Sequence, residues 1–249
     1  MRNRIVGAGV VVLVLLGVGV WYQFFREDAP DAVDLTAASE QLDQDVAEDP
    51  VPDAVPDPVE SFDGDPTGTW IVDDEIGSFD FETASGSFAG FRVAEELTIG
   101  KVTAVGRSGG VTGSLTIADG TLTATEITVD MTTIVSNESR REAAIRRAIN
   151  ATANPAATFV LSEPVELPPE LKDGSQVSIE ATGDLTVNAI TNPVTITIDA
   201  LIREDGFGVV VGSIDVVWQD FGVTPPSAPI VVSIADQGVV EFQLILAKG

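Results

Sequence analysis

Residues 136–161, SNESRREAAIRRAINATANPAATFVL, decide the fold, because they place one convincing helix in a chain that otherwise has the pattern of successive strands. The helix starts with S-R-R-E, which matches a capping box. In such a box the Ser139 hydroxyl caps the backbone and Glu142 reaches back toward it, and Glu142 also forms a favourable i,i+4 pair with Arg146. The sequence therefore predicts a helix that begins at Ser139.

The same stretch also shows where the helix ends. An apolar face runs from Ala144 to Ile149, and Asn154-Pro155 follows it. Because the residue before a proline is pushed toward extended geometry, the chain should enter a strand at Thr158–Leu161. A helix this short does not persist alone. We therefore expect it to dock on a sheet or to plug one end of a barrel.

Period-two alternation of apolar residues recurs through much of the remaining chain. It is clearest in Val177–Val187 and Val194–Ile202, on either side of a predicted turn at Thr191–Pro193, and it continues in Ile214–Trp218 and Val240–Leu246. Such alternation is typical of antiparallel strands that are buried on one face. The earlier strand candidates are Thr69–Val72, Phe79–Thr83, Phe91–Thr98, Val102–Val105, Val111–Ile117 and Leu122–Met131.

Turn residues stand where hairpins need them. Asp-Gly pairs occur at 119–120, 173–174 and 205–206, and this dipeptide favours tight hairpin turns. Within Leu122–Met131 the apolar phase slips, which predicts a β-bulge near Glu126, and bulges bend sheets. A series of short strands joined by such turns predicts a sandwich or a closed barrel.

Residues 1–26 form a candidate membrane anchor. Ile5–Tyr22 is an uninterrupted apolar run, close to the roughly 20 residues that a helix needs to cross a bilayer. Arg2 and Arg4 precede it and acids follow it, which keeps the N-terminus cytoplasmic and exports the rest. A cleaved signal peptide is the alternative, but the run is long and no clear small-residue cleavage site follows. We expect a single-pass anchor.

Residues 27–66 and 67–249 differ sharply in composition. The first segment has fourteen Asp or Glu residues, no Lys or Arg and several prolines, which predicts a disordered linker. The second is long enough to bury a core and forms the predicted globular domain. It carries 25 acidic and ten basic residues. This balance excludes nucleic acid as an expected partner, because binding to phosphates needs a basic surface.

The available side chains limit the chemistry. The chain has no His and no Cys, which removes the usual general base, the usual metal ligand and the strongest nucleophile. Carboxylate pairs such as Asp73-Asp74 and Glu95-Glu96 would suit a glycosidase, although adjacent acids are usually solvated charge. No calcium-loop spacing is present. We therefore expect no catalytic residues, no metal site and no cofactor.

The arginines of the predicted helix allow two interpretations. They balance the charge of an acidic domain, or they lie beside a barrel mouth and receive the anionic head of an amphiphile, because guanidinium pairs well with phosphate. The candidate head-group contacts are Arg140, Arg141, Arg146 and Arg147.

Several fragments, taken in order, resemble the YceI-like family. They are GTWIVDDEIGSFDFE at 68–82, GRSGGVTGSLTI, SRREAAIRRA, NPAATFVL, GDLTVNAITNPVTI at 183–196, DFGV and VEFQLIL. The resemblance covers essentially all of residues 67–249. It implies an extended, lipocalin-like antiparallel β-barrel with a helix in one connection, whose interior holds a polyisoprenoid or a related amphiphile such as a quinone-like lipid. It also implies export to the bacterial periplasm or envelope.

Two positions depart from the family pattern. Where the family commonly has Arg-Asp before the helix, this chain has Arg141-Glu142, and where it often has His-Gly after the L-T-[ILV] strand, this chain has Asn188-Ala189. Neither change touches the apolar lining, so lipid binding is compatible with both.

These observations predict an all-β protein, a lipocalin-like barrel with one short helical insert behind an N-terminal transmembrane helix, that binds or carries a lipid without catalysis. A filled structural or adhesive module on a stalk, and a hydrolase, are the alternatives. The side chains expected to line the cavity are Phe81, Phe91, Ile127, Val129, Phe159, Leu161, Leu185, Ile196, Ile214, Trp218, Phe242 and Leu244.

Overall fold

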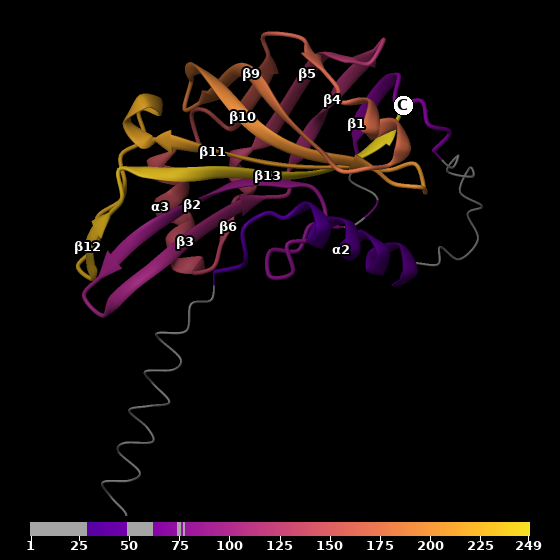
Figure 1. The fold of residues 1–249 in the computed structure, drawn as a ribbon. Coiled ribbons are helices and arrows are strands. Elements are labelled where there is room, and N and C mark those ends of the chain that lie inside the picture. The colour runs from indigo at the N-terminus through magenta and orange to yellow at the C-terminus, as the bar shows by residue number, and fades with distance from the viewer. Residues whose placement is uncertain (1–28, 49–61, 74–75, 77) are drawn as a thin grey trace, which may run out of the picture.

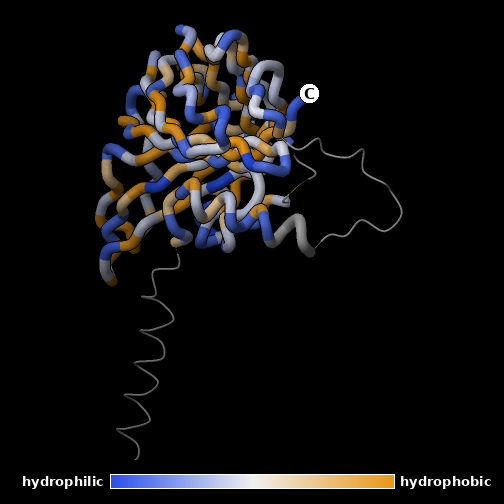
Figure 2. Tube along the Cα trace, turned by 45° about the vertical axis from the view of Figure 1, so that its right-hand side comes forward, coloured by the Kyte–Doolittle hydropathy of each residue, from blue (hydrophilic) through white to orange (hydrophobic). Residues whose placement is uncertain are grey.

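The computed structural model describes residues 29–48, 62–73, 76 and 78–249. Within them an antiparallel sheet closes into a barrel (Figure 1), because β1 pairs with both β4 and β13. Hydrophobic and hydrophilic residues alternate along its strands (Figure 2). The predicted all-β, lipocalin-like barrel is confirmed. In ring order the strands are β1 (Gly68–Val72), β4 (Val111–Ala118), β5 (Thr121–Asp130), β7 (Ala156–Leu161), β9 (Val177–Val187), β10 (Ile190–Ile202), β11 (Gly208–Val217) and β13 (Gln237–Lys248).

Along one edge β13 pairs with two different strands, and this lengthens one end of the barrel. Residues 239–243 pair with β2, whereas residues 246–248 pair with β1. The β2–β3 hairpin therefore leaves the ring and extends beyond it, with β6 on β3 and β12 on β2. The strands outside the ring are β2 (Phe88–Leu97), β3 (Gly100–Ser108), β6 (Val135–Ser136), β8 (Val165–Glu166) and β12 (Val231–Ile234).

The helix α3 (Ser139–Ala148) docks at this extended end, as expected. Ile145 and the adjoining Ile149 are buried in a cluster with Leu185 of β9 and with Phe221. This packing supplies the stabilisation that so short a helix lacks by itself. Three short 3₁₀ helices complete the connections: η1 (Met131–Thr133), η2 (Pro169–Asp173) and η3 (Trp218–Phe221).

The start of α3 differs from the predicted capping box. Glu138, not Ser139, has the extended backbone of an N-cap, and its carboxylate accepts a hydrogen bond from the Arg140 amide. Ser139 is already the first helical residue, so its hydroxyl is not placed to cap. The predicted i,i+4 pair is confirmed, with Arg146 Nη1 3.7 Å from Glu142 Oε2.

The strand predicted at Phe79–Thr83 is wrong. This segment is a turn, in which the Asp80 carboxylate accepts hydrogen bonds from the Thr83 amide and hydroxyl. Only an isolated bridge joins Asp80 to Ser85. The short Asp80 side chain binds the local backbone and so competes with strand pairing.

The turn predicted at Thr191–Pro193 is also displaced. The turn between β9 and β10 consists of Asn188 and Ala189, whose φ angles of 52° and 60° match a type I′ hairpin turn. Thr191–Pro193 lie inside β10, and Pro193 faces Asp184 of β9. The dipeptide signal of Asn-Ala is weaker than that of Asn-Gly, because Ala pays a steric penalty at positive φ.

The Asp119-Gly120 turn is confirmed, with φ angles of 51° and 73°. The bulge in β5 lies at Thr123, because that residue is the extra one between the pairs made by Leu122 and Ala124. It is therefore three residues before the predicted Glu126. Of the other Asp-Gly pairs, the one at 205–206 joins β10 to β11, whereas the one at 173–174 ends η2.

The helix α2 (Leu35–Glu48) corrects the expectation that residues 27–66 form a disordered linker. It lies against the outside of the barrel below β11 and β13 (Figure 1). Leu35, Ala38 and Leu42 recur at helical spacing and are buried there. The acidic composition concealed this apolar stripe. The buried partners of α2 are Phe207, Val209, Val211 and Ile245.

The anchor predicted at residues 1–26 lies outside the described residues, and so does the segment 49–61 of the predicted linker. Among the residues that the structure describes, no helix has both the length and the hydropathy needed to cross a bilayer.

Candidate functional site

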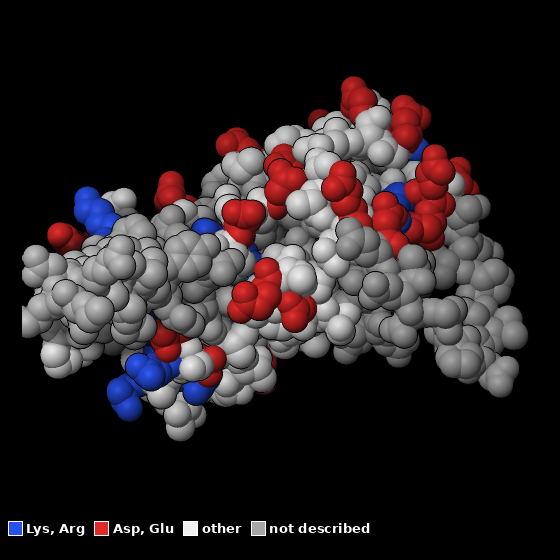
Figure 3. All heavy atoms as spheres, turned by 90° about the horizontal axis from the view of Figure 1, so that it is seen from below, with Lys and Arg blue, Asp and Glu red and all other residues white. Residues whose placement is uncertain are grey.

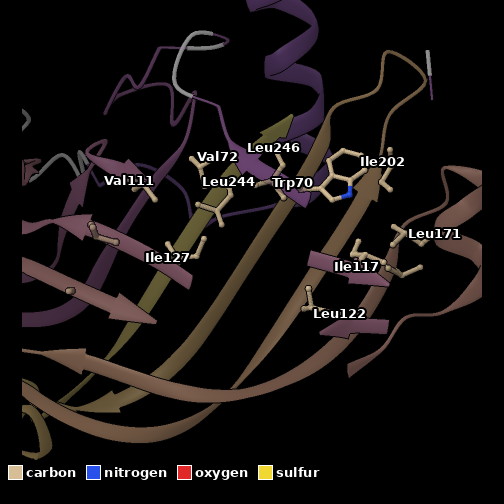
Figure 4. Packing of buried hydrophobic residues seen from close by; sticks show 13 residues of the cluster. Trp70, Val72, Val111, Ile117, Leu122, Ile127, Leu171, Ile202, Leu244 and Leu246 are labelled. Carbon is tan, nitrogen blue, oxygen red and sulfur yellow. The ribbon is translucent and has the colours of Figure 1, made fainter. Parts of the chain in front are cut away.

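A cavity of about 630 Å³ lies inside the barrel. Its inner end is formed by Trp70, Ile117, Leu122 and Leu171, whose side chains point inward from β1, β4, β5 and η2 (Figure 4). Trp70 is held in place because its indole Nε1 donates a hydrogen bond to the Pro66 carbonyl at 2.8 Å. The inner end is therefore a packed apolar floor.

The other end of the cavity lies under the β2–β3 hairpin, α3 and β12. We call this part the mouth end and define it as residues 95–102, 137–148 and 225–234. Ile99 and Ile230 line the cavity here and are exposed to solvent. The cavity is thus open at the mouth end and apolar along its length.

Most of the predicted lining residues lie on the cavity wall. Their positions follow from strand alternation, because every second side chain of a barrel strand points inward. Phe81 is the exception: it lies in the turn before β2 and does not line the cavity. The predicted residues that do line it are Phe91, Ile127, Val129, Phe159, Leu161, Leu185, Ile196, Ile214, Trp218, Phe242 and Leu244.

Glycines on neighbouring strands make room for the aromatic lining. A Cβ on Gly106 would lie 2.6 Å from the Phe91 ring, and one on Gly212 would lie 2.4 Å from the Phe242 ring. Gly183 has the same relation to Phe159. Because these rings lie over glycines, they rest against the wall and leave the centre of the barrel open.

A polar pair marks the mouth end. Glu95 of β2 is only 7% exposed, and its Oε2 lies 3.0 Å from Arg141 Nη2. Burial raises the pKa of Glu95, and the charge of Arg141 opposes that shift. The Asn137 Oδ1 accepts a long hydrogen bond from Arg141 Nη1, at 3.4 Å, while its Nδ2 donates to the Thr103 carbonyl. Arg141 is thus held between a carboxyl and an amide.

Two polar atoms on the cavity wall lack a hydrogen-bond partner among the described residues. They are the Glu95 Oε2, whose contact with Arg141 is an ion pair without hydrogen-bond alignment, and the Thr125 Oγ1. Unpartnered buried polar atoms are costly, so each is a candidate contact for a polar group of a ligand. The sequence carried a signal for Glu95, since it occupies an inward-facing position between Val93 and Leu97.

The structure separates the four candidate arginines into two pairs. Arg140 and Arg141 line the cavity. Arg146 and Arg147 do not, and Arg146 instead donates a hydrogen bond to the Ile134 carbonyl at 3.0 Å and pairs with Glu142. The helix turns its C-terminal arginines away from the cavity, so only the first pair fits the predicted head-group role.

An ion pair that sequence reasoning missed lies on the outer wall. Arg107 and Glu241 are both buried, and the Arg107 Nε and Nη2 donate to the Glu241 Oε1 at 3.0 and 2.7 Å. The guanidinium also stacks over the Phe88 ring and donates to the Asp31 carbonyl. The segment before α2 therefore covers a charged pair that would otherwise face solvent.

The described residues contain no cluster of three or more potential metal ligands. The cavity wall is mainly apolar, with the Glu95–Arg141 pair at the mouth end and isolated polar groups such as Thr125 elsewhere on the wall. The volume of the cavity and its mainly apolar lining suit a hydrocarbon ligand.

Comparison with known proteins agrees with this geometry. A family model described as the YceI-like domain matches residues 79–246, which is more than half of the chain. The chain belongs to the YceI-like family. A comparison with curated proteins gave no match.

Three solved structures are similar to this YceI-like chain at low sequence identity. A polyisoprenoid binding domain from Saccharophagus degradans, implicated in plant cell wall breakdown, is 13% identical and has a TM-score of 0.51, covering 66% of this chain and 94% of that one. Burkholderia cenocepacia BcnA is 16% identical, with a TM-score of 0.49 and coverages of 64% and 94%. The Campylobacter jejuni YceI protein is 12% identical, with a TM-score of 0.45 and coverages of 58% and 84%.

The two departures from the expected family pattern have structural roles in this YceI-like chain. Glu142, which replaces the Asp of the family pattern, forms the i,i+4 ion pair with Arg146, as described above. Asn188 accepts a hydrogen bond from the Asn154 side chain at 3.0 Å and donates one to the Phe221 carbonyl at 3.3 Å. The β9–β10 turn is thereby tied to the loop after α3 and to η3.

Proposed function

We propose that this YceI-like protein binds an apolar or amphiphilic lipid of the polyisoprenoid type inside the barrel. The observation that carries the proposal is the apolar cavity of about 630 Å³ that opens at the mouth end. This volume lies within the range of about 300–1,000 Å³ typical of small-molecule sites. The Saccharophagus degradans neighbour, a polyisoprenoid binding domain, supports the same ligand class.

The driving force is apolar burial. Each Å² of apolar surface removed from water contributes about 25 cal/mol, so a hydrocarbon chain enclosed in the cavity needs little polar contact to bind. The aromatic lining that rests on glycines keeps this space open. A filled structural module would close it, and the cavity therefore favours the lipid carrier.

The head group is proposed to lie at the mouth end, beside Glu95, Arg140 and Arg141. Arg140 is exposed there, whereas Arg141 already faces Glu95 at 3.0 Å. A phosphate would gain charge-assisted contacts from Arg140 and would compete with Glu95 for Arg141. A hydroxyl or carbonyl head would leave the ion pair intact.

The head-group role has a matched test. Arg140→Gln/Arg141→Gln should weaken binding of a phosphorylated isoprenoid more than binding of a neutral quinone. The control Arg146→Gln/Arg147→Gln removes the same charge outside the cavity lining and should affect both ligands equally. Titration with each lipid measures this difference. Equal losses for both lipids in the first variant would contradict the head-group role.

Membrane tethering is part of the proposal. The apolar run Ile5–Tyr22, with arginines before it and acids after it, supports a single-pass anchor that leaves the barrel outside the cytoplasm. Protease accessibility of the barrel in spheroplasts tests the orientation. A barrel that is cleaved only after lysis of the cells would contradict it.

Native mass spectrometry of the full chain, after gentle detergent extraction, tests the lipid proposal. We expect a co-purifying apolar ligand that chemical extraction identifies as a lipid. A protein that is empty in every preparation, and that takes up no polyisoprenol when this lipid is added, would overturn the proposal.

A further inference from the structure

Three large apolar side chains are exposed together at the mouth end. Ile99 is 44% exposed, Ile230 56% and Val232 59%. Ile99 lies in the turn between β2 and β3, and the neighbouring Thr98 amide donates a hydrogen bond to the Ile230 carbonyl at 2.8 Å. Val232 lies at the irregularity where β12 pairs with β2. The three side chains therefore lie together on one edge of the mouth end, which we call the apolar edge.

This apolar edge is continuous with the cavity. Ile99 and Ile230 belong to the cavity wall as well as to the exposed surface, and Val231 lines the cavity between Ile230 and Val232. A hydrocarbon chain that moves along this path from outside the protein meets apolar side chains from the edge to the interior. The exposed patch is thus an extension of the site.

The mouth end carries much less net negative charge than the rest of residues 67–249. Residues 95–102, 137–148 and 225–234 carry five Lys or Arg residues and four carboxylates, whereas the rest of residues 67–249 carries five Lys or Arg residues and 21 carboxylates. Lys101, Arg140 and Arg147 are exposed. In Figure 3 most of the blue atoms lie toward the left-hand end, where Figure 1 shows β12 and the β2–β3 hairpin, and red atoms outnumber blue ones from the centre to the right.

We propose that the mouth end docks on an anionic phospholipid bilayer, with Ile99, Ile230 and Val232 inserted at the boundary between head groups and acyl chains. Interfacial binding of this kind scales with the apolar area buried and with the attraction of basic residues to anionic lipids. The acidic remainder of the barrel is repelled by the same surface, so the docked orientation is selected. This inference rests on the proposed lipid binding and adds its route: the lipid passes between bilayer and cavity without crossing water.

The absence of Cys from the sequence makes a direct test practical. We would label Thr98→Cys in the full chain with an environment-sensitive fluorophore, reconstitute it in vesicles of phosphatidylethanolamine and phosphatidylglycerol, and include nitroxide-labelled acyl chains as quenchers. The matched label is Glu170→Cys, in η2 at the opposite end of the barrel. We expect a blue-shifted and strongly quenched signal at position 98 and an unquenched signal at position 170.

A paired set of variants isolates the apolar edge. Ile230→Ser/Val232→Ser should lower the docking equilibrium constant by about tenfold or more and thereby reduce the quenching of the label at position 98, since each lost aliphatic side chain removes apolar area worth more than one CH₂ group of about 0.8 kcal/mol. Ile71→Ser/Val160→Ser removes one exposed Ile and one exposed Val from outside the mouth end and should leave the quenching unchanged. Equal quenching in all three proteins would overturn the docking proposal.

Lipid occupancy, measured by native mass spectrometry of the same proteins, separates the two proposals. If position 98 is unquenched while the protein still carries a lipid, docking is wrong and lipid binding stands. In the opposite case, position 98 is quenched as expected and only Ile230→Ser/Val232→Ser loses the quenching, but the barrel is empty and takes up no polyisoprenol. Docking then stands and the proposed ligand is wrong.

Discussion

Gly106→Ala offers a direct way to narrow the cavity from within its wall. The added Cβ would lie 2.6 and 3.0 Å from two atoms of the Phe91 ring and 3.3 Å from the Ile134 Cδ1. All three are side-chain atoms, so the backbone can stay in place while the ring moves. Phe91 packs edge to face against Trp218, with ring centroids 5.9 Å apart. The ring therefore has to leave this contact and enter the cavity.

The expected cost of Gly106→Ala follows from overpacking. Forcing an extra methyl group into a packed wall costs about 1–3 kcal/mol in unfolding free energy. The displaced ring also occupies space that the lipid needs, so affinity for a fluorescent polyisoprenol should fall. Urea unfolding and a fluorescence titration measure the two effects on the same protein.

A double variant supplies the control. In Gly106→Ala/Phe91→Ala the ring is absent, so the added methyl group has nothing to displace into the cavity, and lipid affinity should return toward that of Phe91→Ala alone. Such non-additivity is expected for residues in direct contact. If the losses of affinity from Gly106→Ala and Phe91→Ala instead add, the aromatic ring does not transmit the effect and the reasoning fails.

Three further predictions concern other parts of the molecule. Burial raises the pKa of Glu95 above its ordinary value of 4.5, so the folded state holds the proton more tightly than the unfolded state does. The unfolding free energy of the wild type, measured relative to Glu95→Gln, should therefore fall as the pH rises through and above 4.5. Urea titrations in which the difference between the two proteins stays constant with pH would contradict this. Arg107→Met removes the shorter ion pair of the buried Glu241, which then keeps only Arg92 at 3.7 Å, and should cost about 3 kcal/mol in urea unfolding, at the low end for a broken buried pair, whereas Arg107→Met/Glu241→Leu should recover most of the loss. Leu42→Ala should cost about 2 kcal/mol, at the low end for buried leucines, and no loss of stability would mean that α2 does not dock.

Strand alternation made most of the barrel and its lining predictable. Leu185 of β9 and Ile196 of β10 occupy alternate positions whose side chains point into the barrel. A shift by one residue would have turned all the inward-facing side chains of each strand outward. The polar residues of the site were less visible. Glu95 stands next to Glu96 in the sequence, and only the strand geometry shows that Glu95 points into the cavity while Glu96 is exposed.

The docking of α2 was not predicted, because composition averaged over residues 27–66 is dominated by acids. The strands that α2 covers do carry a sequence signal of this contact. Residues 209–211 and 244–246 are continuous apolar runs, which are typical of strands buried on both faces. Such runs indicate that something covers the outer wall, but the covering segment lies more than 160 residues earlier in the chain, so local patterns do not identify it.

The central claim is that the barrel holds a lipid in its interior, and native mass spectrometry on three forms of the full chain tests it most directly. Ala181 lines the cavity from β9, whereas its neighbour Thr182 does not. The account predicts one apolar ligand per wild-type chain, none in Ala181→Trp, and a retained ligand in Thr182→Trp. Ligand that persists in Ala181→Trp, or a wild-type chain that stays empty when polyisoprenol is added, would contradict it.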